Sequence, residues 1–144
     1  ECRLAADFDL HGRVVRIADG DTVTILDRHN KQHKVRLHGI DTPERDQPYG
    51  TAATNALKRL INNKPVAVDI VTTDKYKRKV GTLYRDGVNI NLAMVTEGYA
   101  WWYQYYAPNE NALKAAEQRA RRQKRGLWAG SHPIAPWDWR KKLR

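Results

Sequence analysis

The sequence predicts an α+β fold, mainly a small β-barrel, formed by a single domain. Five short apolar stretches have the composition or period of strands, glycines mark turns between them, and helical periodicity is confined to segments between and after the strands. The length of 144 residues is sufficient for one hydrophobic core without covalent staples. The 41% apolar and 29% charged residues are typical of a globular chain.

The expected strands are short and most are bounded by polar turns. The first two are joined around Asp19-Gly20, a dipeptide common in tight hairpins. The polar segment TTDKYKR separates the last two. The five strands are expected at residues 14–17, 23–26, 35–40, 66–71 and 79–84.

Three helices are expected between and after these strands. Residues 49–62 place Ala53, Ala56, Leu57, Leu60 and Ile61 on one face. Residues 90–97 form a short helix followed by Gly98 at a C-cap position, and residues 109–124 form a longer one that ends before Gly126. Five short strands with helices inserted late predict a small, partly open barrel of the OB type.

The charge is concentrated in the second half of the chain. The formal net charge is +10; residues 1–72 carry 11 basic and 10 acidic residues, whereas residues 73–144 carry 15 and 6. A basic half with interleaved aromatic residues is typical of a nucleic-acid binder, although charge alone is equally compatible with a solvated basic face. One basic group lies at the end of the long expected helix: Arg119, Arg121, Arg122, Lys124 and Arg125.

The ends of the chain leave its compartment open. No apolar run approaches the roughly 20 residues that span a bilayer, so no membrane partner is expected. Cys2 is the single cysteine and cannot form an internal disulfide. Residue 1 is not Met, which suggests a trimmed chain or a removed leader.

Acidic residues follow two of the expected strands despite the excess of positive charge. In ADGDTVTI, Asp19 suits a hairpin turn, whereas Asp21 gains little from being acidic at a strand start. In GIDTPER, Asp41 and Thr42 are also suited to capping a turn. If both carboxylates converge at one rim of the barrel, the ligands are oxygens, which suits Ca²⁺ rather than Zn²⁺. No EF-hand pattern is present, so the site would be dispersed.

Two arginines accompany these acids. Arg36 lies inside the third expected strand, where alternation places it on one face with His38 and Ile40, and Arg78 ends the polar loop before the fifth. Each has a simpler interpretation as an ion-pair partner. Beside a metal and a phosphodiester, a guanidinium binds two phosphate oxygens and stabilises the charge of a five-coordinate phosphorus.

The ordered motifs DGDT, VRLHGIDTPE, DKYKRKVGTLYRDG, YYAPN and GLW resemble the staphylococcal nuclease (thermonuclease) family. The resemblance covers about residues 12–128, and the closing PIAPWDWRKK, within the tail 129–144, resembles a tail of bacterial members. It implies one nuclease domain, an OB-fold barrel with three helices, and Ca²⁺-dependent cleavage of DNA and RNA at the 5′-oxygen to leave 3′-phosphates. It also implies a secreted or periplasmic protein, and we expect a monomer.

The resemblance assigns roles to individual residues. The implied metal ligands are Asp21, Asp41 and the backbone carbonyl of Thr42, and Arg36 and Arg78 match the arginines that neutralise the phosphate. Glu44 matches the glutamate beside the attacking water, where it acts as general base or only orients the water. The implied substrate contacts are Lys75, Tyr76 and Tyr106.

Two positions depart from the family pattern, and one rival hypothesis stays open. Gln104 replaces the first tyrosine of the Tyr-x-Tyr-x-Pro stretch, so nucleoside stacking is expected to shift to Tyr103 or Tyr105. Lys77 replaces a loop glycine, which is expected to change the loop or add a phosphate contact. The rival is a non-catalytic OB-fold module that binds single strands; it explains the basic half but not the retained acids and arginines.

The histidines are interpreted as structural or exposed, and the five tryptophans mostly as core residues or anchors of the tail. The five histidines show no metal-binding spacing. Trp137 and Trp139 are expected to fasten the C-terminus onto the barrel.

Overall fold

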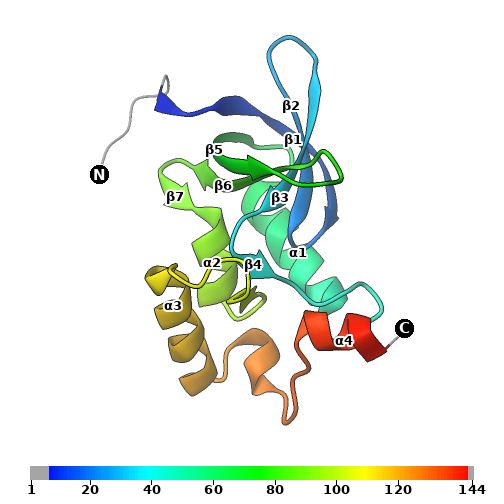
Figure 1. The fold of residues 1–144 in the computed structure, drawn as a ribbon, viewed down its shortest axis with the longest axis vertical. Helices are drawn as coiled ribbons and strands as arrows, with labels where there is room; N and C mark the ends of the chain where they lie inside the picture. Colours follow the sequence, from blue (N-terminus) through cyan, green and yellow to red (C-terminus); the bar gives the residue numbers. More distant parts are fainter. Residues whose placement is uncertain (1–6, 143–144) are drawn as a thin grey trace.

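The computed structural model describes residues 7–142, so Cys2 lies outside the described residues. A β-barrel forms one end of the molecule and the helices cover the other (Figure 1). Within the described range, no helix is long and apolar enough to span a bilayer. The strands are β1 (Leu10–Asp19), β2 (Thr22–Leu26), β3 (Gln32–Leu37), β4 (Ile40–Asp41), β5 (Pro65–Thr73), β6 (Lys79–Arg85), β7 (Val88–Asn89) and β8 (Trp101–Trp102). The helices are α1 (Gly50–Ile61), α2 (Ile90–Thr96), α3 (Asn111–Arg122), the 3₁₀ helix η2 (Gly126–Ala129) and α4 (Pro136–Lys142).

Five strands close into the predicted barrel. Strands β3, β2, β1, β5 and β6 are neighbours in that order, and each successive pair is antiparallel. A parallel pairing of β3 with β6, in which Arg36 faces Val80, joins the two ends of the sheet. The barrel is therefore closed where the sequence predicted a partly open one, because closure depends on a contact between strands far apart in the chain. The α+β, OB-like fold is confirmed.

The hydrophobic core lies between the barrel and the helices α1 and α2. Alternate residues of the strands point inward, including the fully buried Val14, Ile25 and Val35. Helix α1 packs against β1 and contributes Leu57 and Ile61 to the same core. The predicted face of α1 is thus confirmed, although Leu60 is only partly buried.

The third strand ends earlier than expected. Gly39 has φ 79°, in the left-handed region, and a Cβ there would lie 2.7 Å from Leu113 Cδ1. The chain therefore leaves the sheet at this residue, and β4 starts a separate pairing with β8. The predicted continuous strand over residues 35–40 is wrong, and the alternation that placed Arg36 and Ile40 on one face does not continue past the break.

The C-terminal segment forms a fourth helix in the described residues, which the sequence did not predict. Trp137 contacts Trp101 of β8 in a T-shaped pair and stacks on Tyr103, with ring centroids 5.4 and 5.2 Å apart respectively. Trp139 Nε1 donates to Asp46 Oδ1 at 3.3 Å, in the loop before α1. Both tryptophans therefore fasten the tail, as expected, but onto β8 and this loop rather than onto the barrel itself. Helix α4 lies beside the start of α1 in Figure 1.

Candidate active site

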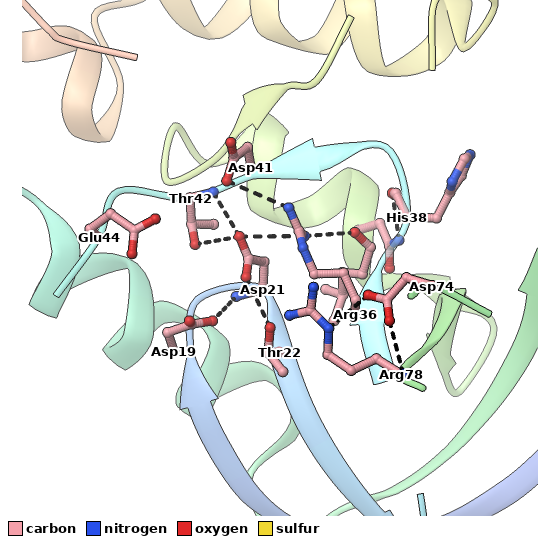
Figure 2. Close-up of polar contacts among 12 residues, drawn as sticks. Asp19, Asp21, Thr22, Arg36, His38, Asp41, Thr42, Glu44, Asp74 and Arg78 are labelled. Carbon is pink, nitrogen blue, oxygen red and sulfur yellow. Dashed lines mark hydrogen bonds and ion pairs between the residues drawn. The ribbon is translucent and has the colours of Figure 1, made fainter. Parts of the chain in front are cut away.

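Asp21 and Thr42 lie side by side at one end of the barrel. The β1–β2 turn presses against the end of β4: a Cβ on Gly20 would lie 2.9 Å from Thr42 Oγ1. The N–H and hydroxyl of Thr42 both donate to Asp21 Oδ2 at 3.0 Å. Figure 2 shows Asp21, Asp41 and Thr42 gathered at this junction. Asp21 and Asp41 are only 6% and 1% exposed, so both carboxylates require compensating partners.

Arg36 supplies one of these partners. Its side chain rises from β3 between the two aspartates (Figure 2). Nη1 lies 3.4 Å from Asp21 Oδ2, and Nη2 lies 3.5 Å from Asp41 Oδ1. Nη1 also donates to the carbonyl of Leu37 at 3.0 Å, which fixes the plane of the guanidinium. Both ion-pair distances are long for charge-assisted hydrogen bonds, so Arg36 neutralises the cluster without saturating either carboxylate.

The carboxyl groups of Asp41, Asp21 and the partly buried Asp19 have different proton affinities. Burial, together with the neighbouring charge of Asp21, raises the pKa of Asp19 to about 7. Burial likewise raises the pKa of Asp41 to about 6, against the hydrogen bonds from Arg140. Burial acts in the same direction on Asp21, but Arg36 and the donors of Thr42 outweigh it and lower its pKa. Asp21 is therefore the most readily ionised of the three, whereas Asp19 and Asp41 hold protons more tightly than ordinary carboxyls do, and a cation bound beside them would favour their ionised forms.

Asp19 was underestimated from the sequence. It occupies the predicted hairpin, paired with Thr22 across the turn. Its Oδ1 also accepts from the backbone N–H of Asp21 at 3.0 Å, which places its carboxylate in the cluster. The spacing Asp-Gly-Asp was the available signal. Because a tight hairpin favours Asp-Gly, the turn alone accounted for Asp19, and no role at the site was predicted for it.

Arg140 is the second residue that sequence reasoning missed. It reaches the cluster from α4 and donates from Nη2 to Asp41 Oδ2 and from Nη1 to Glu44 Oε1, both at 2.7 Å. The hydrogen bonds that Arg140 donates to Asp41 and to Glu44 raise the pKa of Arg140 above its usual value despite partial burial. Glu44 is thereby joined to Asp41 through a shared guanidinium. No local pattern reveals this contact, because the partners are 99 and 96 residues apart.

Arg78 approaches the cluster from the loop between β5 and β6. Its Nε donates to Asp74 Oδ2 at 2.8 Å, and its side chain points toward Asp21 and Arg36 in Figure 2. Asp74 Oδ1 accepts from the backbone N–H groups of Tyr76 and Arg78, which closes the loop. Lys77 has φ 63°, so it takes the left-handed conformation that suits a glycine. The loop therefore keeps the turn conformation expected for the glycine of the family pattern, and Lys77 adds a positive charge at this position.

The predicted substrate contacts are exposed. Tyr76 and Tyr106 are 68% and 76% exposed, and Lys75 Nζ lies 5.3 Å from the centroid of the Tyr76 ring. Tyr106 packs edge-on against Tyr103. Burial, together with the charge of Asp41, raises the pKa of Tyr103, whose ring stacks on Trp137. Tyr103 is therefore the aromatic neighbour of the site in the region where Gln104 breaks the family pattern.

The donor set suits a hard cation, but its neighbouring carboxylates point to different partners rather than to one shared point. The available groups are carboxylate and carbonyl oxygens, which suit Ca²⁺ or Mg²⁺ rather than a soft metal. Over residues 7–142, however, no three acidic, histidine or cysteine side chains meet as a ready metal site. Asp41 and Glu44 point to Arg140 instead. Two histidines pair elsewhere: His33 with Asp27 at 2.8 Å, and His38 with Glu110 at 3.7 Å.

Comparisons with known proteins agree with the geometry. Residues 34–130 match the family model described as staphylococcal nuclease homologue. A relative from Escherichia coli O157:H7, named an uncharacterized endonuclease, is 44% identical over 133 residues, which cover 92% of this chain and 86% of the relative. A micrococcal nuclease from Shigella flexneri is 40% identical over 144 residues, covering 92% and 82% of the two chains. A staphylococcal-like nuclease from Arabidopsis thaliana is 40% identical over 114 residues, covering 79% of this chain and 35% of the relative. The chain therefore belongs to the staphylococcal nuclease family of hydrolases.

Proposed function

We propose that this nuclease hydrolyses phosphodiester bonds of DNA and RNA in a Ca²⁺-dependent reaction, cleaving at the 5′-oxygen and leaving 3′-phosphate ends. The observation that supports this best is the placement of Arg36 between Asp21 and Asp41 with the Arg78 side chain pointing to the same place. Buried acids attract a cation, and guanidinium groups attract a phosphate. A site with both is suited to a phosphodiester held beside a metal ion.

The side chains have distinct roles in the proposed reaction. A water oxygen attacks phosphorus, the bond from phosphorus to the 5′-oxygen breaks, and the phosphate stays on the 3′-oxygen. Arg36 and Arg78 hold the non-bridging oxygens and bind them more tightly as negative charge accumulates, which lowers the barrier. Glu44 either accepts the proton of the water or orients it. The leaving 5′-oxygen takes up a proton to become a hydroxyl.

The metal would be held by Asp21, Asp41 and the carbonyl of Thr42. When bound, Ca²⁺ polarises the phosphate and lowers the pKa of a coordinated water. The support for a cation in this position is the set of oxygen donors that Asp21, Asp41 and Thr42 bring to one end of the barrel, and a bound cation would favour the ionised form of Asp41 against the burial that raises its pKa to about 6.

The substrate is proposed to follow the basic and aromatic surface. Lys75 and Tyr76 lie on the exposed β5–β6 loop next to Arg78, where a terminal phosphate and sugar would meet a cation and a ring face. A second aromatic surface is formed by Tyr103, which is close enough to Asp41 to respond to its charge, and by Tyr106, which packs edge-on against Tyr103. The rival binding module needs these surfaces but no buried acids, and a binding surface gains nothing from two desolvated aspartates.

The test is an incubation of the full chain with single-stranded and duplex DNA and with RNA, in Ca²⁺ or in excess chelator. We expect cleavage only with Ca²⁺. The new 5′-hydroxyl ends should accept phosphate from polynucleotide kinase directly, and the new 3′ ends should prime a polymerase only after phosphatase treatment. Retarded but uncut substrate in every Ca²⁺ reaction would support the binding module. Cleavage that yields 5′-phosphates would contradict the proposed bond.

A further inference from the structure

Arg140 fills the position between two of the proposed active-site carboxylates. Its guanidinium donates to both oxygens of Asp41, at 3.3 Å to Oδ1 and 2.7 Å to Oδ2, and to Glu44 Oε1 at 2.7 Å. The Arg140 and Glu44 side chains are each 36% exposed, whereas the Asp41 side chain is only 2% exposed. The cation from the C-terminal helix thus makes a shorter ion pair with the buried Asp41 carboxylate than Arg36 does, at 2.7 Å against 3.5 Å.

The helix that carries Arg140 is anchored independently of this contact. The Trp137 ring stacks on Tyr103 with an interplanar angle of 3°, and Trp139 donates to Asp46. Gln47 Nε2 donates to the carbonyl of Ile134 at 2.6 Å, just before the helix. Arg140 is therefore held near the carboxylates whether or not it pairs with them, and its local concentration at the site is high.

A metal ion coordinated by Asp41 requires oxygens that Arg140 now occupies. A guanidinium and a divalent cation cannot both take the same carboxylate lone pairs, and they repel each other at close range. Suppose that a ligand binds only those molecules in which the Arg140–Asp41 contact is broken. Its apparent Kd is then the intrinsic Kd divided by the fraction of such molecules, so the contact raises the apparent Kd. The carboxylates are consistent with this, since Asp41 and Glu44 are turned to Arg140 rather than to Asp21.

We propose that Arg140 is a tethered cation that pairs with Asp41 and Glu44 when no metal ion is bound and competes with Ca²⁺ for them, so that the C-terminal helix sets the metal affinity. The inference rests on the proposed Ca²⁺ dependence. It gives the C-terminal helix a role in metal binding in addition to its packing against the rest of the domain. The opposite role, in which Arg140 orders the carboxylates for the metal, predicts the reverse effect of removing it.

The test is calorimetric titration of Ca²⁺ into the full-length wild type, Arg140→Gln and Lys141→Gln. Lys141 is exposed on the same helix, so its replacement matches the change of charge without touching the carboxylates. We expect Arg140→Gln to lower the Kd for Ca²⁺ by about fivefold or more, within the usual range of coupling between two ligands. Lys141→Gln should leave the Kd close to the wild-type value. Thermal melts should agree, with a larger Ca²⁺-induced rise in Tm for Arg140→Gln than for the wild type.

The outcomes separate the two proposals. An unchanged or raised Kd in Arg140→Gln, with the wild type binding Ca²⁺ normally, would overturn the competition and leave the proposed nuclease reaction intact. An equal fall in Kd for Lys141→Gln would also overturn it, because general charge would then explain the effect. If no variant binds Ca²⁺, the proposed metal dependence and this inference both fail.

Discussion

Asp21→Asn removes one carboxylate charge from the cluster at nearly constant shape. An asparagine oxygen can still accept from the Thr42 N–H, and its amide can face the Thr22 hydroxyl, which now donates to Asp21 Oδ1 at 3.2 Å. The change loses the attraction of Arg36 at 3.4 Å but relieves the repulsion that raises the pKa of Asp19. We therefore expect the metal-free mutant to melt close to the wild type.

The difference should appear when Ca²⁺ is added. At a Ca²⁺ concentration one hundred times the wild-type Kd, linkage stabilises the wild type by about 2.7 kcal/mol. For a domain of this size that is a rise in Tm of roughly 8–11 °C. If losing one charged ligand weakens binding about a hundredfold, the same Ca²⁺ concentration equals the mutant Kd and stabilises it by only about 0.4 kcal/mol. The mutant should then gain roughly 1–2 °C.

The assay is a set of thermal melts in chelator and in Ca²⁺ for the wild type, Asp21→Asn and Asp86→Asn. Asp86 is a matched control, because its side chain is 86% exposed and its φ of 50° is also tolerated by asparagine. The control should show the full wild-type response to Ca²⁺. An equal Ca²⁺-induced shift in the wild type and Asp21→Asn would mean that Asp21 is a turn residue and not a ligand.

Three further predictions concern α3 and its basic end. Arg119 and Arg122 are exposed, and if they contact phosphates their double replacement by glutamine should flatten the salt dependence of log K for DNA by about 0.7–0.9 per contact. An unchanged slope in this double mutant would mean that the basic cluster is a solvated face. The Arg121 guanidinium instead lies 4.2 Å from the Trp128 ring centroid and pairs with Glu117, so Arg121→Gln should reduce stability without changing the salt dependence. Burial raises the pKa of Glu117, so the folded state binds its proton more tightly than the unfolded state, and wild-type stability should fall as pH rises from about 4.5 through the raised value. Glu117→Gln keeps an acceptor for the Trp102 N–H, so its stability relative to the wild type, measured by urea unfolding, should increase over that window. A constant difference across pH would contradict this.

Local patterns predicted the elements that depend on local chemistry. Alternating apolar residues identified the barrel strands, and the apolar face of residues 50–61 identified α1, because burial follows directly from these periods. The acids and Arg78 were predicted as candidates because strand ends and loops are the places where polar side chains reach a common rim, and Arg36 and Glu44 were matched to their roles by the family resemblance. Their pairings were not predictable, since Arg36 meets two partners supplied by different turns.

The missed features depend on contacts between distant segments. The break at Gly39 requires a left-handed residue packed against Leu113, which no strand pattern within residues 35–40 reveals. Helix α4 is only seven residues long and is stabilised by Trp137 and Trp139 against other elements rather than by its own periodicity. Neither a motif nor the charge pattern predicted the contacts of Arg140, because they form only when α4 packs beside Glu44.

The most direct test of the catalytic centre is the single-turnover rate of DNA cleavage, in saturating Ca²⁺, for the wild type, Arg36→Lys, Arg78→Lys and the control Arg16→Lys. Lysine keeps the charge but cannot bind two phosphate oxygens at once, so each of the first two variants should lose about 2.7 kcal/mol or more of transition-state stabilisation, roughly a hundredfold in rate. Arg16 is exposed on β1, and its replacement should leave the rate unchanged. A near-wild-type rate for either Arg36→Lys or Arg78→Lys would remove that arginine from the reaction, and near-wild-type rates for both would place the chemistry outside this cluster.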